Sequence, residues 1–266
     1  MVTTLALMAL LELAPNQATL KLTDIQASHG LMGPKREKDE VMLGDAYVLE
    51  WIIKGLKTDA GGKAYYTMSV EVKNSKGKVV FREKPKDDEK KEHLLSLGGD
   101  QVNAFYLVSF GTDSEPGKYT ITITITDLTS KMSDSFTRTV EVLKPGFGMV
   151  LTSLSFDANG LVPAAVTIQV GQTIQINTRV TGYAVDEKKN PSFLASMRVL
   201  SGGKDVTKPH SVTINRHFDK TVKFMPLSFV LNMNRPGTFT IELKVADQIA
   251  KKVTTERFDI TVVSRK

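Results

Sequence analysis

The chain has 266 residues, of which 41% are hydrophobic and none is Cys, and its formal net charge is +6. At roughly 150 residues per domain, this length predicts about two domains. The absence of Cys excludes disulfides, a thiol nucleophile, a zinc–thiolate site and an iron–sulfur cluster. No apolar run approaches the roughly 18 residues that a membrane-spanning helix needs.

The charge is unevenly distributed along the chain. Residues 1–146 carry 19 Lys and Arg against 20 Asp and Glu, a net −1, whereas residues 147–266 carry 16 against 9, a net +7. A basic excess confined to the second half suits an anionic partner for that half, but a moderate excess spread over a strand surface more often serves solubility alone.

Residues 1–18 contain a short apolar stretch from Leu5 to Leu11 that resembles the hydrophobic region of a secretory signal peptide. No Lys or Arg precedes the stretch, and Glu12 and Asn16 occupy the −3 positions before Ala14 and Ala18, where small residues are expected. We interpret this segment as a signal-peptide remnant and expect export to the periplasm or cell surface. The alternative is an N-terminal segment packed on the first domain of a cytoplasmic protein.

Alternation of apolar and polar residues dominates the rest of the chain, which predicts half-buried β-strands. The clearest strand is 119–127, where Tyr and Ile alternate with Thr. Each half contains seven such segments. They are 18–27, 45–57, 66–73, 78–83, 102–110, 118–126 and 135–143, then 149–156, 163–182, 193–200, 204–214, 220–232, 238–246 and 253–263.

The two halves repeat one pattern. Pro116-Gly117 introduces the strand that ends at Asp127, and Pro236-Gly237 introduces a similar strand that ends at Asp247, 120 residues later. An offset of 127 relates Gly44 and the strand after it to Gly171. A repeat of this length is the size of a domain, so we infer duplication of a folding module.

Short turns connect the predicted strands and favour antiparallel pairing. Residues 74–77 and 201–203 have the Gly that hairpin turns need. Pro and Gly in residues 144–148 mark the predicted boundary. The sequence therefore predicts an all-β protein of two tandem antiparallel immunoglobulin-like or fibronectin-like β-sandwich domains, 19–145 and 149–266.

The paired closing strands of each half resemble the last two strands of bacterial immunoglobulin-like modules found in exported and envelope proteins. Tyr119 and Phe239 stand where such modules place a corner aromatic residue, and Phe239 lacks the hydroxyl that makes the corner hydrogen bond. The resemblance implies a role in binding, adhesion, spacing or envelope assembly. Tandem sandwiches also resemble periplasmic pilus-type chaperones, although the cleft Arg and Lys of that family have no identifiable counterparts here.

The sequence contains no recognisable catalytic, cofactor-binding or metal-binding motif. Histidines 210 and 217 are separated by an odd number of residues, which places them on opposite faces of a strand. Asp157 begins a segment that lacks the distal Glu of a calcium loop, so we predict an Asx turn. Asp127 and Asp247 are interpreted as turn initiators. We therefore predict that the protein is not an enzyme and needs no cofactor.

The remaining features concern binding surfaces. Trp51 is assigned to the core, Tyr65 and Tyr66 to opposite faces of one strand, and residues 84–93 to a solvated loop. The densest basic region is the candidate anion-binding site, and it comprises Lys204, Lys208, Arg216, Lys220 and Lys223.

We predict a non-enzymatic binding or structural module of the cell envelope, with a protein, an anionic polysaccharide or another envelope component as partner. An accessory substrate- or glycan-binding module of an envelope hydrolase system and a periplasmic chaperone-like protein are the alternatives. The absence of an aromatic-basic platform disfavours nucleic acid.

Overall fold

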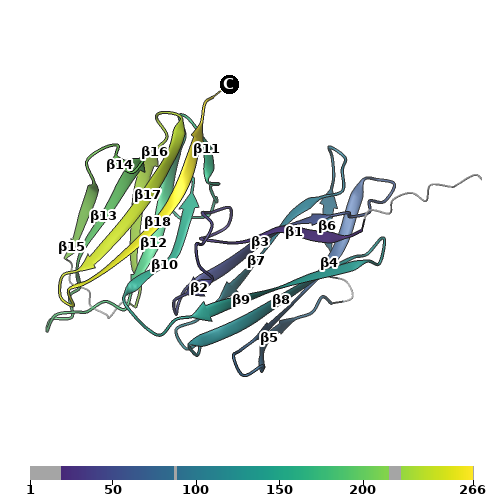
Figure 1. Ribbon diagram of the computed structural model, residues 1–266, viewed down its shortest axis with the longest axis horizontal. Coiled ribbons are helices and arrows are strands. Elements are labelled where there is room, and N and C mark those ends of the chain that lie inside the picture. The colour runs from purple at the N-terminus through teal and green to yellow at the C-terminus, as the bar shows by residue number, and fades with distance from the viewer. Residues whose placement is uncertain (1–18, 87–88, 216–222, 266) are drawn as a thin grey trace, which may run out of the picture.

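The computed structural model describes residues 19–86, 89–215 and 223–265. These residues form two β-sandwiches that follow each other along the chain, each built from a three-stranded and a six-stranded sheet. Figure 1 shows the first sandwich on the right and the second on the left, meeting near β2 and β10. β9 ends at Val142 and β10 begins at Gly148, so the connection between the sandwiches is short.

The first sandwich packs the three-stranded sheet β1-β3-β7 against a sheet in the order β2-β9-β8-β4-β5, with β6 also paired to β4. Neighbouring strands are antiparallel except for β2 and β9, which are parallel. The strands are β1 (Lys21–Ser28), β2 (Glu40–Val41), β3 (Ala46–Lys54), β4 (Lys63–Lys73), β5 (Val79–Glu83), β6 (Lys91–Leu94), β7 (Val102–Ser109), β8 (Gly117–Asp127) and β9 (Ser133–Val142).

The second sandwich repeats this topology. Its three-stranded sheet is β10-β12-β16, and its larger sheet is β11-β18-β17-β13-β14, with β15 also paired to β13. The strands are β10 (Gly148–Ser155), β11 (Thr167–Gln169), β12 (Thr173–Thr181), β13 (Ser192–Ser201), β14 (Lys204–Asp205), β15 (His210–Asn215), β16 (Met225–Asn232), β17 (Gly237–Asp247) and β18 (Lys252–Val263). The prediction of two tandem antiparallel, immunoglobulin-like sandwiches is confirmed.

Each sandwich has its own apolar core, formed by the inward side chains of alternating strands. Ile121, Ile123 and Ile125 of β8 are fully buried, as the Tyr-Thr-Ile alternation predicts. Trp51 is also in the core, and its ring packs edge-on against Phe136 at a centroid distance of 5.3 Å. Without disulfides, this burial of apolar surface is the main favourable contribution to the stability of both sandwiches.

The turns and the corner aromatic residue also follow the sequence pattern. The N–H of Gly77 donates to the carbonyl of Asn74 at 2.9 Å, which closes the predicted turn between β4 and β5. Ser201 pairs with Lys204 across the predicted turn between β13 and β14. The Tyr119 hydroxyl donates to the Glu115 carbonyl at 2.8 Å and so makes the corner hydrogen bond.

Several expectations about individual strands were wrong. Residues 163–182 form two strands, because the chain turns between β11 and β12 at Gly171, whose φ is +92°. Residues 204–214 likewise form β14 and β15, separated by a loop that contains Pro209. The expected solvated loop 84–93 includes the start of β6, where His93 stacks on Tyr66. The short strand β2 has too few residues for its period to be read.

Candidate functional site

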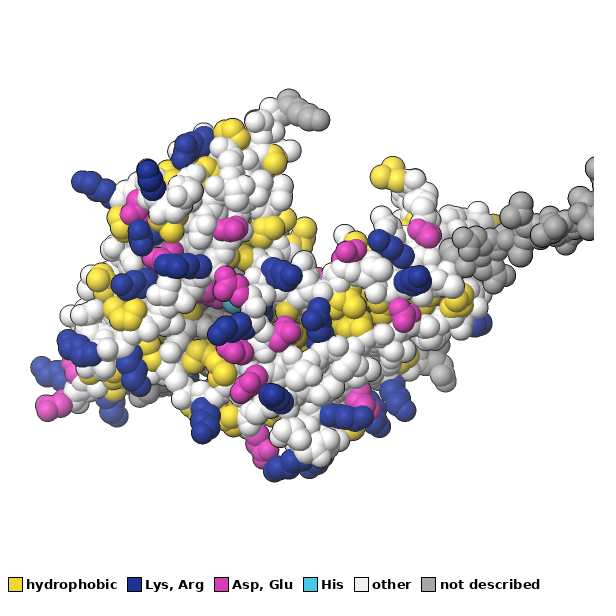
Figure 2. All heavy atoms as spheres, in the orientation of Figure 1, with side chains coloured by type: hydrophobic (Ala, Val, Ile, Leu, Met, Phe, Trp, Pro, Cys, Tyr) yellow, Lys and Arg dark blue, Asp and Glu magenta, His cyan; other side chains and the backbone are white. Residues whose placement is uncertain are grey.

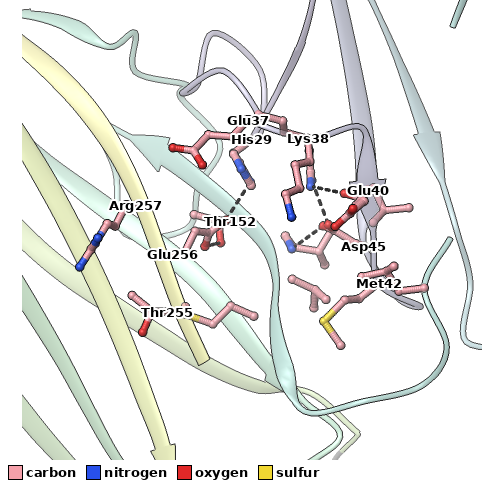
Figure 3. A pocket seen from close by; sticks show the side chains of 16 residues that line it. His29, Glu37, Lys38, Glu40, Met42, Asp45, Thr152, Thr255, Glu256 and Arg257 are labelled. Carbon is pink, nitrogen blue, oxygen red and sulfur yellow. Dashed lines mark hydrogen bonds and ion pairs between the residues drawn. The ribbon is translucent and has the colours of Figure 1, made fainter. Parts of the chain in front are cut away.

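A cavity of about 280 Å³ lies where the two sandwiches meet. The segment from the end of β1 to the start of β3 forms one wall, and residues of β10 and β18 form the other. Figure 2 shows that charged side chains of both signs gather at this junction, and Figure 3 shows the lining side chains from close by, with ten of them labelled. Two buried charged residues, Arg36 and Asp45, line the cavity, so we take it as the candidate site.

A buried ion pair forms the part of the site that belongs to the first sandwich. The Arg36 guanidinium contacts the Asp45 carboxylate at 2.9 Å, and each side chain is only 6% exposed. Arg36 also donates to the carbonyls of Ser28, Glu40 and Ala46 at 3.2, 3.2 and 2.9 Å. Because a buried charge is tolerated only with a partner and hydrogen bonds, these contacts fix the segment between β1 and β3.

Asp45 extends this network across the junction. Its second carboxylate oxygen accepts from the Ala46 N–H at 2.9 Å and from the Leu151 N–H at 2.7 Å, and Leu151 belongs to the second sandwich. Leu151 lies in a β-bulge of β10 and has a φ of +55°. Bulges redirect local backbone groups. This bulge directs the N–H of Leu151 toward Asp45.

A second set of polar contacts crosses the junction beside the first. The His29 imidazole Nδ1 lies 2.9 Å from a Glu256 carboxylate oxygen, and each side chain is 16% exposed. The Thr152 hydroxyl donates to the other Glu256 oxygen at 2.6 Å and lies 2.9 Å from the Thr178 hydroxyl. Nδ1–H can donate to this carboxylate whether the ring is neutral or protonated.

The environment of Glu256 favours its ionised form. Burial alone raises the pKa of Glu256, but the hydrogen bond and charge of His29, the Thr152 hydroxyl and the charge of Arg36 outweigh burial. The net effect holds the pKa of Glu256 below its ordinary value. The carboxylate is therefore available as a hydrogen-bond acceptor at neutral pH.

Two glycines allow the sandwiches to approach closely. Gly30 has a φ of +72°, and a Cβ there would lie 2.8 Å from the Cβ of Ser153. Gly44 has a φ of +86°, and a Cβ there would lie 2.4 Å from the ring of Phe224. Both conformations favour glycine, and both positions lack room for a side chain.

These contacts link the two sandwiches, and we call the network of Arg36, Asp45, His29, Glu256 and Thr152 with the Leu151 N–H the joint. The carboxylate oxygens of Asp45 and Glu256 accept hydrogen bonds from both sides of the junction. In the described part of the chain, no group of three or more His, Asp or Glu is placed to hold a metal ion.

The predicted anion-binding residues lie elsewhere, in the second sandwich. Lys204 is in β14, Lys208 follows it in a loop and Lys223 precedes β16, and all three are exposed. Arg216 and Lys220 lie outside the described residues. β14 and β15 both pair with β13 instead of with each other, so these strands do not form a separate hairpin. Anion binding by this region stays a prediction.

Other residues singled out in the sequence have local roles. Asp157 accepts from the N–H groups of Asn159, Leu161 and Val162, which confirms the Asx turn. Tyr65 hydrogen-bonds to Asp59, and the Lys90 ammonium lies 4.3 Å from the centroid of its ring. His210 is in β15, and His217 lies outside the described residues.

No described helix is long and apolar enough to cross a membrane. No family model and no curated protein sequence matches the chain.

Among solved structures, the C-terminal domain of the Streptococcus pyogenes antigen I/II-family protein AspA is 11% identical, with a TM-score of 0.30, over 94% of this chain and 100% of that one. The C-terminal domain of the Streptococcus agalactiae AgI/II polypeptide BspA is 9% identical, with a TM-score of 0.29, over 91% of this chain and 99% of that one. A red sea bream transglutaminase is 8% identical, with a TM-score of 0.28, over 95% of this chain but only 32% of that one. Nothing about binding or activity follows from likenesses this weak.

Proposed function

We propose that the protein is a non-enzymatic binding or structural module of the cell envelope, in which the joint holds two sandwiches in one orientation. The observation that carries the proposal is the hydrogen-bond network across the junction, where Asp45 accepts from the Leu151 N–H and His29 contacts Glu256. Inter-domain contacts of ordinary size permit relative motion, so buried and fully hydrogen-bonded charges here favour a rigid arm. The apolar stretch Leu5 to Leu11 supports the envelope location.

The joint is testable because the chain has no Cys, so two introduced cysteines carry unique spin labels. With labels at Ser135→Cys and Lys244→Cys, which are exposed on different sandwiches, electron–electron distance measurements should give one narrow distribution at neutral pH. The double substitution His29→Ala and Glu256→Ala removes the contact between these two residues and should broaden the distance distribution. Glu37→Gln, which removes a charge from the same cavity, should leave it narrow.

Acid should open the same joint. The folded-state pKa of Glu256 is lower than its ordinary value. The ionised carboxylate therefore contributes fully to the stability of the joint when the pH is above the ordinary pKa of Glu. That contribution is lost as the pH falls through the lower folded-state value, when Glu256 takes up a proton. The distance distribution between the two labels should therefore broaden at acid pH. A wild-type distance distribution that is already broad at neutral pH, or that the His29→Ala and Glu256→Ala changes leave unaltered, would contradict a rigid joint.

The location is tested by fractionating native cells and sequencing the N-terminus of the protein. Recovery with the envelope or periplasmic fraction supports the proposal. Recovery in the cytosol with Met1 intact overturns the envelope role and leaves the joint to be judged on the distance measurements.

A further inference from the structure

The two three-stranded sheets end in four edge strands, and three of these edges are interrupted. β1 and β10 each contain a bulge at the same place in the repeat, with Asp24 at φ +53° and Leu151 at φ +55°. β16 contains Pro226 near its start. Bulges, prolines and charges are the means by which proteins prevent strand addition at sheet edges.

β7 has none of these features. Its eight residues, VNAFYLVS, include no Pro and no charged side chain, and they pair with β3 in an unbroken register. The N–H of Phe110 donates to the carbonyl of Asp45, and the N–H of Gly44 donates to the carbonyl of Phe110, so position 110 points toward β3. By alternation, Asn103, Phe105, Leu107 and Ser109 direct their N–H and carbonyl groups away from β3.

The second sandwich provides an internal comparison. The N–H of Met233 donates to Gln172, and Gly171 donates to Met233, so Met233 corresponds to Phe110. Pro226 lies seven residues before Met233, and Asn103 lies seven residues before Phe110, so the two occupy equivalent positions in the repeat. Pro226 has no N–H to offer at the outer edge of β16, whereas Asn103 keeps an outward N–H at the equivalent position of β7. No described residue pairs with the outer edge of β7.

An apolar groove of about 480 Å³ runs beside this edge, between β7 and β5 of the opposite sheet. Tyr106 and Val108 line it from β7, and Val80 and Phe81 line it from β5, where they are 48% and 46% exposed. Phe81 pairs with the buried Val72 across the ladder, so both side chains lie on the core-facing side of the larger sheet. Phe81 remains exposed because the smaller sheet has no strand opposite it.

The geometry points to an occupant: we propose that β7 is a docking edge for one extended segment of a partner chain, apolar at alternate positions. Main-chain hydrogen bonds to Phe105 and Leu107 would extend the smaller sheet, and every second side chain would enter the groove over Phe81. Because residues of β5 and β7 both line the groove, the space beside β7 is bounded on two sides, which suits a single extended strand. The Glu83 carboxylate, which accepts from the Tyr106 hydroxyl, favours a cationic residue at that end.

This inference rests on the proposed binding role for the existence of a partner, and its test is separate from that of the joint. The probe is a fluorescein-labelled peptide, acetyl-Lys-Thr-Val-Thr-Val-Thr-Val-Thr-Lys-amide, titrated with the full chain while fluorescence anisotropy is measured. We expect saturable binding. Phe105→Pro removes an outward N–H without removing a hydrogen bond to β3, and it should weaken binding about tenfold or more. Phe105→Thr keeps the N–H and should bind within about twofold of wild type.

A second measurement needs no variant of the protein. Peptides N-methylated at every second residue come in two registers, and only one of them blocks the hydrogen bonds to β7. Binding should be lost for one register and retained for the other. The proposal is overturned by absence of saturable binding to the wild type, by equal binding of both registers, or by full binding to a folded Phe105→Pro variant. A narrow distance distribution together with absent peptide binding would remove this docking edge and leave the rigid joint standing.

Discussion

Arg36→Met is expected to lower the free energy of unfolding of the first sandwich by about 3–5 kcal/mol, because it leaves the buried Asp45 carboxylate without its cation. Met has a similar length and packs in the same space, so the loss is of charge and hydrogen bonds more than of volume. The carbonyls of Ser28, Glu40 and Ala46 lose their donors at the same time. The segment that supplies His29 to the joint should loosen as well.

Equilibrium urea unfolding measures this effect. Trp51 is the only Trp in the chain and is buried in the first sandwich, so its fluorescence reports on that sandwich. The matched control is Arg82→Met, which removes an exposed ion pair with Glu71 and should lower the unfolding free energy by at most about 1 kcal/mol. If Arg36→Met shifts the midpoint no more than Arg82→Met, the buried pair is not a principal support of the junction.

The strands and the repeat could be predicted from the sequence because both depend on local pattern. Thr alternates with Ile in β8, and the same two-residue period returns 120 residues later in β17. In both strands the alternation identifies which side chains face the core. The same alternation failed across Gly171, where apolar residues continue on both sides of a turn. It also could not reveal β2, whose place depends on pairing with the distant β9.

The joint depends on contacts that local pattern does not encode. Asp45 meets Leu151 only because a bulge redirects one N–H of β10, and a bulge leaves no clear mark in a single sequence. The burial of Glu256 could have been inferred from its position in the repeat. Glu256 is 120 residues after Phe136, whose ring packs on Trp51, so a carboxylate occupies a core-facing place in the repeat. A charged residue at such a place predicts a buried partner.

The two carboxylates at equivalent places in the repeat, Asp127 and Asp247, should each contribute about as much to the free energy of unfolding as the buried Arg36 does. Asp127 is fully buried and accepts from the N–H of Thr129 and the hydroxyl of Ser130 in its own turn, and from the N–H of Lys57 in the loop after β3. Asp247 is 1% exposed. It accepts from Ile249 and Ala250 in its own turn, and from the N–H of Ala184 in the loop after β12.

Each carboxylate therefore ties two distant loops of its own sandwich together, and this role extends the predicted one of turn initiation. Asp127→Ala and Asp247→Ala should each lower the unfolding free energy of their own sandwich by about 3–5 kcal/mol. Asn in either place keeps one acceptor oxygen but loses the charge, so Asp127→Asn and Asp247→Asn should lose about half as much.

The repeat makes these two substitutions controls for each other. Asp127→Ala should shift the urea midpoint of Trp51 fluorescence, whereas Asp247→Ala should leave that midpoint nearly unchanged, because distant independent sites act additively. Hydrogen exchange should show the converse, with faster exchange of the β12 and β17 amides in Asp247→Ala. Equal shifts of Trp51 fluorescence by both variants would mean that the sandwiches unfold as one unit through the joint. A wild-type midpoint for Asp127→Ala would instead show that the tie between the loops adds little to the stability of the first sandwich.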